Sequence, residues 1–243
     1  PSANARWGNS MAVAAGGFLL SRAMQLFAAA GEDINRCVGG AVRRVCRGQM
    51  LELQHAGDLD LSESHYFTII ADKTSALYEL ACRIGGMHGG LEPRHTDALT
   101  RYAADVGVGF QLIDDLLDLV GDERALGKPR ATDVRGGIYT LPVLHTLARG
   151  DGDALRLRAI LGERELSHAA LGDARALLDD NGSIEYARST ARTVLLRARD
   201  WLNGLPPGPA LDALVSFPAH VFARAALANA ATAAGAASGM WWL

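Results

Sequence analysis

The chain has 243 residues, of which 49% are hydrophobic, and a formal net charge of -3 at pH 7. A chain of this length and composition can bury a sizeable core within one domain. Its slightly acidic balance creates no basic field, so we do not expect nucleic acid as a partner.

The chain is predicted to be helical almost throughout, because Ala-, Leu-, Arg- and Glu-rich segments alternate with short breaks and strand-type alternation of β-branched residues is missing. In chain order, breaks are expected near Gly31, at 57–62, at 85–93, at 121–137, at 150–152, at 181–182 and at 204–209. The fold class is therefore predicted to be all-α, with one domain over residues 1–243 and no internal repeat.

Neither a signal peptide nor an uninterrupted apolar run long enough to span a bilayer is recognisable in the sequence. The Ala-rich end from Phe217 to Leu243 comes closest, but polar residues interrupt it, so a packed or frayed terminal helix is expected there. The closing Trp241 and Trp242 predict at most a peripheral contact with a membrane surface.

The three cysteines, Cys37, Cys46 and Cys82, show neither the spacing of metal ligands nor an even framework for disulfides. We expect each of them to be a small core residue in a reducing environment. The cysteines therefore favour a cytoplasmic protein.

Three aspartates, Asp114, Asp115 and Asp118, lie in an apolar run over residues 110–120 that has the length and leucine content of a buried helix. Helical periodicity places Asp114 and Asp118 on one face, with Asp115 beside them and Gln111 one turn earlier. Burying like charges together is costly unless a cation neutralises them. Because magnesium is commonly shared between a few carboxylates and phosphate oxygens, the pattern predicts a Mg²⁺ bridge to a diphosphate.

An amphipathic surface helix with its acids in water is the alternative, since a short Asp-Asp-x-x-Asp pattern has many chance matches. The apolar residues on both sides of the pattern count against it. The polar loop that follows contains Lys128 and Arg130, and cations beside a metal–carboxylate cluster suit a polyanionic ligand.

The stretch FQLIDDLLDLVGDERALGKPRATDVRGGIYTLPVL, residues 110–144, resembles the second aspartate-rich region of trans-isoprenyl (polyprenyl) diphosphate synthases. Three further segments follow the family's order, namely SANARWGNSMAVAAGGFLLSRA, RGQMLELQ and DKTSALYELACRIGG. With the helical tail, the resemblance covers nearly the whole chain. It implies an isoprenoid-synthase-type helical bundle around a central cavity.

The resemblance also implies roles for single residues outside the aspartate cluster. Lys73 would contact the allylic diphosphate, the helix would be kinked around Thr74, Lys128 would reach the same diphosphate, and Gln49 would face the allylic site. For Gln49 and Lys73, a solvated polar side chain on a helix is the alternative that the residues themselves leave open.

In the aspartate-rich region, the resemblance implies that Gln111 and Asp114 are polar contacts near the allylic diphosphate. Asp114, Asp115 and Asp118 would approach magnesium directly or through water. Asp133 is either an acid that supports this cluster or a helix N-cap.

The sequence departs from the family's pattern at several places. Gly17 stands where the family has an aspartate, and Ile138 stands where it has a second lysine. The loss of this lysine weakens the neutralisation of the diphosphate unless Arg130 or Arg135 compensates for it. The family's first aspartate-rich motif and paired arginines would precede residue 1, so we expect either a fragment of a longer protein or a natural partial paralogue.

The expected function is that of a Mg²⁺-dependent prenyltransferase, which condenses an allylic prenyl diphosphate with isopentenyl diphosphate and releases pyrophosphate. The product would be a linear trans-polyprenyl diphosphate, and the family implies a homodimer. The alternative is a non-catalytic subunit or diphosphate-binding paralogue of a heteromeric prenyl synthase, which the missing first motif, Gly17 and Ile138 favour. A terpene cyclase on the same helical fold is disfavoured by the Gly-Lys-Pro continuation after the aspartates.

Overall fold

The computed structural model describes residues 2–121, 131–163 and 165–229, with side chains described as far as residue 223. Within these ranges the chain forms helices and no strand, which confirms the all-α prediction. Its backbone divides into two compact units, Pro1–Arg43 and Arg44–Leu243. The assignment of residues 1–243 to one domain stays a prediction.

The first unit contains α1 (Ala3–Ala28) and the beginning of α2 (Glu32–Gln54). The Ser2 hydroxyl caps α1 by accepting a hydrogen bond from the Ala5 amide at 3.2 Å. Gly8 interrupts the helix with a φ of 78°, a conformation that glycine adopts without steric cost. The predicted break near Gly31 is present, and this glycine also has a positive φ of 105°.

Helix α1 is long and apolar enough to cross a membrane by length and composition, with a mean hydropathy of 1.4 over its most apolar window. We expected no uninterrupted apolar run of this length, and α1 does not contain one; it reaches this hydropathy as an average over apolar and polar residues. Small polar residues such as Asn9, Ser10 and Ser21 interrupt the apolar sequence, but the mean hydropathy stays high enough for a candidate membrane span.

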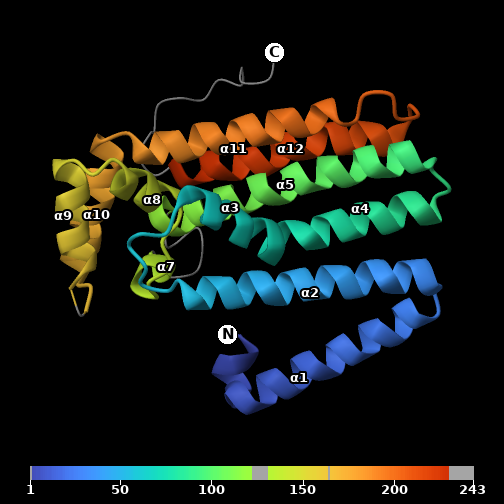
Figure 1. The fold of residues 1–243 in the computed structure, drawn as a ribbon, viewed down its shortest axis with the longest axis horizontal. Coiled ribbons are helices and arrows are strands. Elements are labelled where there is room, and N and C mark those ends of the chain that lie inside the picture. Colours follow the sequence, from blue (N-terminus) through green and yellow to red (C-terminus); the bar gives the residue numbers. More distant parts are fainter. Residues whose placement is uncertain (1, 122–130, 164, 230–243) are drawn as a thin grey trace. The chain divides into compact units, whose positions relative to one another are not determined.

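The second unit is a helical bundle (Figure 1). Its elements after α2 are α3 (Glu63–Ile70), the π-helical turn η1 (Ala71–Ser75), α4 (Ala76–His88), α5 (Pro93–Val120), α7 (Thr132–Arg135), α8 (Leu141–Ala148), α9 (Gly152–Leu161), α10 (His168–Asp180), α11 (Ser183–Asp200) and α12 (Pro209–Asn229).

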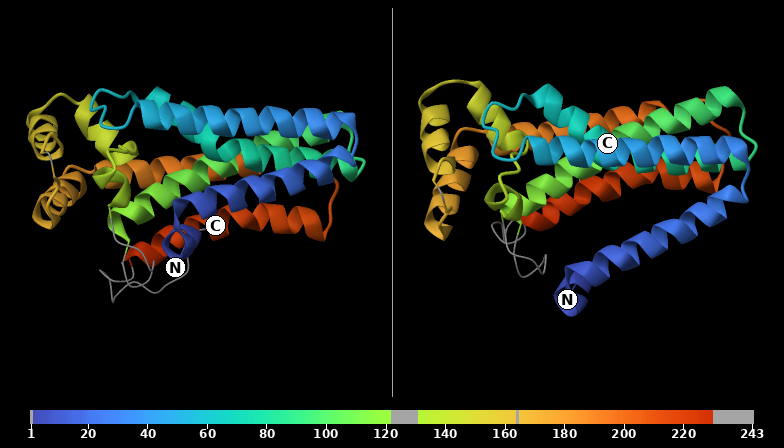
Figure 2. Two further views of the ribbon diagram at one scale, coloured as in Figure 1. Left: turned by 90° about the horizontal axis from the view of Figure 1, so that it is seen from below. Right: turned by 60° about the horizontal axis from the view of Figure 1, so that its bottom comes forward.

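Helix α5 is the central element of this unit and packs against α4, α11 and α12 (Figure 1). Leu112, Ile113 and Leu116 of α5 are at most 2% exposed. A helix surrounded by other helices needs apolar side chains on most of its faces. The central position of α5 therefore explains the long apolar run that carries the aspartates. Helices α9 and α10 pack together at one end of the bundle, next to α8 (Figure 2).

The predicted breaks are largely present, with three differences. Helix α4 continues past Gly85 to His88, and the short α7 lies within the expected break over 121–137. The break between α9 and α10 was not predicted, although Ser167 is a regular N-cap that accepts a hydrogen bond from Ala170.

The helical ladder widens at η1, between α3 and α4. The Ala76 amide donates to the carbonyl oxygen of Ala71, which is the i to i+5 pattern of a π-helix. The irregularity that the family resemblance implies around Thr74 is therefore present as a π-turn.

The cysteines are all free thiols, as expected. Cys37 and Cys82 are half-buried, but Cys46 is exposed, so the prediction of a core position is wrong for Cys46. It lies on a face of α2 that is turned to solvent, which the sequence around it does not reveal.

Candidate active site

A cavity of about 260 Å³ lies within the second unit, at the end of α5 that carries the aspartates. Its walls come from the end of α2, from α3, η1 and α5, and from α7 with the residues after it. The lining residues are Glu52, His55, Leu61, Tyr66, Ile69, Ile70, Lys73, Gln111, Asp114, Asp115, Asp133, Ile138, Tyr139 and Thr140. The site thus combines four carboxylates and a lysine with apolar side chains.

The lysine of the cavity is paired with a glutamate. Lys73 Nζ donates to Oε1 and Oε2 of Glu52 at 2.7 and 2.8 Å. Gln49 donates to the same carboxylate at 3.0 Å and does not itself line the cavity. Sequence reasoning missed Glu52, although it follows Gln49 by three residues and therefore shares a face of α2 with it.

A chain of hydrogen bonds links the π-turn to the aspartates. Thr74 Oγ1 donates to Gln111 Oε1 at 2.6 Å, and Gln111 Nε2 donates to Asp115 Oδ1 at 2.7 Å. The Tyr66 hydroxyl donates to Asp115 Oδ2 at 2.5 Å. The structure therefore brings together the predicted residues Thr74, Gln111 and Asp115, and adds Tyr66 to them.

The pKa of Asp115 is strongly shifted by its surroundings. Burial raises its pKa to about 7, although the hydrogen bonds from Tyr66 and Gln111 lower it, and the nearby Asp133 and Asp114 raise it. Burial, followed by the charge of Asp115, also raises the pKa of Tyr66 well above its usual value. An excess of carboxylates in a buried place favours the binding of a cation.

Asp118 lies outside the lining of the cavity and holds α7 in place. It is 2% exposed, and its carboxylate accepts hydrogen bonds from Thr132 Oγ1 at 2.6 Å and from the Asp133 amide at 3.1 Å. Its carbonyl oxygen accepts from the Ala131 amide at 2.8 Å. A metal-binding role for Asp118 stays a prediction.

Asp133 is not a helix N-cap, so that alternative is wrong. Ala131 occupies the position before α7, in a left-handed conformation with a φ of 52°. Asp133 follows inside the helix, and its side chain lines the cavity. Through its own hydrogen bonds to α7, Asp118 thus helps to place a further carboxylate beside Asp114 and Asp115.

Ile138, which stands where the family resemblance expects a second lysine, lines the cavity. Arg135 does not compensate there, because it is exposed and donates to His168 Nδ1 at 3.1 Å. Lys128 and Arg130 lie outside the described residues.

The donor set of the cavity fits a magnesium ion that is completed by other ligands. Within the described ranges, no group of three or more His, Cys, Asp and Glu side chains is arranged to hold a metal ion by itself. Carboxylate oxygens are nevertheless the protein ligands that magnesium prefers, and it normally keeps waters or takes phosphate oxygens for its remaining positions. Asp114 and Asp115 are the residues that would hold it.

The all-α bundle with this cavity is the fold of the helical isoprenoid synthases, as comparison with known proteins shows. Residues 1–178 match the model of the polyprenyl synthetase family. The chain belongs to this family, and a prenyltransferase function follows from that membership.

Two curated relatives illustrate the relationship. The nonaprenyl diphosphate synthase of Mycobacterium tuberculosis is 33% identical over 224 residues, which are 92% of this chain and 67% of the relative. The octaprenyl diphosphate synthase of Escherichia coli is 32% identical over 221 residues, which are 90% of this chain and 68% of the relative. This chain therefore spans about two thirds of the length of these proteins.

Solved structures share the fold. A decaprenyl diphosphate synthase from Rhodobacter capsulatus matches with a TM-score of 0.84 and 31% identity, covering 93% of this chain and 70% of that one. A polyprenyl synthase from Caulobacter crescentus, solved in complex with calcium and isoprenyl diphosphate, matches with a TM-score of 0.84 and 30% identity, covering 91% and 68%.

Proposed function

We propose that this chain is a Mg²⁺-dependent prenyltransferase that condenses an allylic prenyl diphosphate with isopentenyl diphosphate to a linear trans-polyprenyl diphosphate. The observation that carries the proposal is the cavity in which Lys73, Gln111, Asp114 and Asp115 meet beside apolar walls. The Caulobacter crescentus relative, which was solved with calcium and isoprenyl diphosphate, supports a divalent cation and a diphosphate at such a site.

Among the residues that the structure describes, Lys73 lines the cavity with a cationic group that can hold the diphosphate of the allylic substrate. Its ammonium group forms an ion pair with Glu52 at 2.7 Å, so substrate phosphate oxygens would take over or share this ion pair. Gln111, oriented by Thr74 and Asp115, offers a polar contact beside it. Bound magnesium would supply further positive charge, which compensates the charge that develops as the diphosphate leaves.

The remaining chemistry requires a dry environment for the allylic carbocation. The double bond of isopentenyl diphosphate attacks this cation, a carbon–carbon bond forms, and loss of a proton to the released pyrophosphate restores a double bond. Leu61, Ile69 and Ile70 line the same cavity as the carboxylates. Such apolar side chains exclude water from a reactive intermediate.

A non-catalytic, diphosphate-binding subunit of a heteromeric prenyl synthase is the second candidate. It is favoured by Ile138, which lines the cavity at the position where the family resemblance expects a lysine. One fewer cation weakens the neutralisation of a diphosphate.

Incorporation of radiolabelled isopentenyl diphosphate into farnesyl diphosphate tests the proposal, using the complete product of the reading frame that encodes this chain. We expect activity that requires magnesium, is abolished by EDTA and is lost in Asp114→Ala. Binding of magnesium pyrophosphate without any prenyl transfer would contradict the catalytic proposal and favour the subunit.

A homodimer and a cytoplasmic location are part of the same proposal. Helix α1 has no buried residue, and the side chains of Trp7, Phe18, Leu19 and Leu26 are each at least 61% exposed. A second copy of the chain would bury such a surface. The free cysteines fit a reducing compartment. Light scattering of the purified protein would give the oligomeric state.

A further inference from the structure

The π-turn that carries Lys73 and Thr74 is enclosed by two glycines. A Cβ atom on Gly48 of α2 would lie 2.4 Å from the Lys73 amide nitrogen, and one on Gly107 of α5 would lie 2.5 Å from the Ser75 Cα. These distances leave no room for any side chain. Helices α2 and α5 therefore both contact the backbone of η1 directly.

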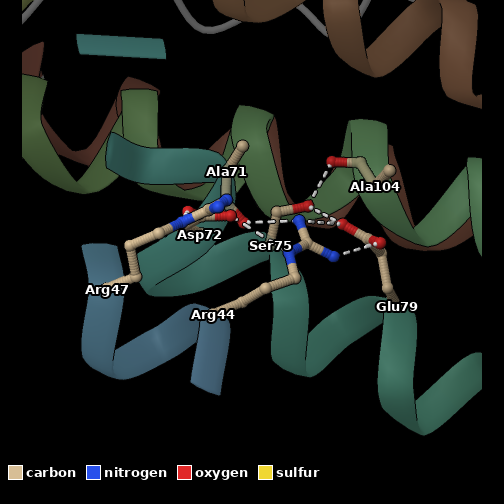
Figure 3. Close-up of polar contacts among 7 residues, drawn as sticks. All are labelled: Arg44, Arg47, Ala71, Asp72, Ser75, Glu79 and Ala104. Carbon is tan, nitrogen blue, oxygen red and sulfur yellow. Dashed lines mark hydrogen bonds and ion pairs between the residues drawn. The ribbon is translucent and has the colours of Figure 1, made fainter. Parts of the chain in front are cut away.

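A cluster of charged side chains on the α2 side holds the same turn (Figure 3). Arg44 donates to Asp72 Oδ1 at 3.0 Å, to Glu79 Oε2 at 2.6 Å and to the carbonyl oxygen of Ala71 at 3.2 Å. The Ala71 carbonyl also accepts the i to i+5 hydrogen bond of the π-turn. Arg44 thus binds the irregular backbone, Asp72 within the π-turn and Glu79 in the helix that follows it.

Asp72 is the centre of this cluster. Its second carboxylate oxygen accepts from Arg47 Nε at 2.5 Å (Figure 3). The residue is 3% exposed and does not line the cavity. Burial by itself would raise the pKa of Asp72, but the hydrogen bonds from Arg47 and Arg44 hold it below its usual value. Asp72 is therefore a buried carboxylate with two arginines, and it lies outside the wall of the cavity.

We propose that Asp72, held by Arg44 and Arg47, is a positioning residue that fixes the π-turn and so presents Lys73 to the diphosphate. This inference rests on the proposed function only for the identity of the ligand. Asp72 and Lys73 are consecutive, so anchoring one side chain orients the next. If the π-turn shifted by one residue along the helix, the side chain of that residue would rotate by about 100° around the helix axis. Such a rotation would turn Lys73 away from the cavity.

The test measures the binding of magnesium pyrophosphate to the chain by titration calorimetry. Asp72→Asn keeps the shape of the side chain and removes its charge, and we expect it to weaken binding about tenfold, as loss of one charge-assisted contact does. Lys73→Gln should weaken binding by at least as much. If Asp72 acts through Lys73, the double variant binds no more weakly than Lys73→Gln alone.

Asp105→Asn is the matched control. Asp105 is also nearly buried, at 9% exposure, and accepts two hydrogen bonds from Arg197 and one from Trp201. It does not line the cavity. This control should lower the melting temperature as Asp72→Asn does and leave pyrophosphate binding within about twofold of the unmodified chain.

Arg47→Gln provides a second, milder variant, because the Arg47 side chain is 62% exposed. It should weaken pyrophosphate binding in the same direction as Asp72→Asn. Unchanged binding in both variants, additive losses in the double variant, or no binding by the unmodified chain would each overturn the inference. Non-additive binding losses in a protein without prenyl transfer would instead overturn the proposed function and leave the positioning role standing.

Discussion

The hydroxyl of Tyr66 on α3 donates a hydrogen bond of 2.5 Å to Oδ2 of Asp115 on α5, across 49 positions of sequence. Both residues are buried, at 4% and 7% exposure. The bond fixes the direction of a carboxylate whose charged form the neighbouring Asp133 and Asp114 disfavour. It also ties the wall of the cavity formed by α3 to the helix that carries the aspartates.

Tyr66→Phe should destabilise the fold by about 1–3 kcal/mol, because a buried acceptor loses its donor. The loss should be larger at pH 8 than at pH 5, since an ionised carboxylate suffers more from a missing donor. Urea unfolding at both pH values measures it. Tyr186→Phe is the control, because the Tyr186 hydroxyl donates to Glu63 at the surface, and a loss of equal size there would contradict the prediction.

The stability of the metal-free protein should depend on the ionisation of Asp115. Its pKa is raised from 3.8 to about 7 in the folded state, so the folded protein binds more protons than the unfolded chain between these values. The free energy of unfolding should therefore fall as the pH rises through this window, by about 1.4 kcal/mol for each pKa unit of the shift. It should level off above pH 7.

Asp115→Asn removes this titration. In the presence of EDTA, the unfolding free energy of the variant should lack the fall between pH 4 and pH 7, beside a constant loss because an amide replaces one of the two acceptor oxygens of Asp115. Parallel curves of unfolding free energy against pH for the two proteins would show that Asp115 ionises normally.

Gly48→Ala should disrupt the π-turn. The added Cβ atom would lie 2.4 Å from the backbone nitrogen of Lys73, and overpacking of this kind costs about 1–3 kcal/mol. Prenyl transfer should fall together with the melting temperature. Gly39→Ala in the same helix meets nothing within 4 Å and should be neutral or stabilise by about 0.5–1 kcal/mol. A Gly48→Ala variant that behaves like this control would contradict the close contact.

Asp118→Asn should lower the melting temperature even in EDTA. The buried carboxylate accepts from Thr132 Oγ1 and from the Asp133 amide with different oxygens, whereas the asparagine amide has one acceptor. The expected loss is about 1–3 kcal/mol. If Asp118 served only to bind metal, its replacement would leave the stability of the metal-free protein unchanged.

The sequence by itself determined the helical fold class and the main acidic residues of the site. Helical periodicity is a local property, so the run over 110–120 was enough to place Asp114 and Asp115 beside Gln111 on a buried helix. The resemblance of the segments around Lys73 and Asp114 to a known family then indicated the prenyltransferase chemistry, which the family match confirms.

The tertiary structure decided which partner each polar side chain has. Asp118 shares the pattern of Asp114 but binds α7, because the chain after α5 folds back onto that side of the helix. Glu52 meets Lys73, and Asp72 meets Arg44, only because α2 lies directly against the π-turn at Gly48. Such pairs are separated by 20 residues or more, so they follow from the packing of distant helices and leave no periodic signal in the sequence.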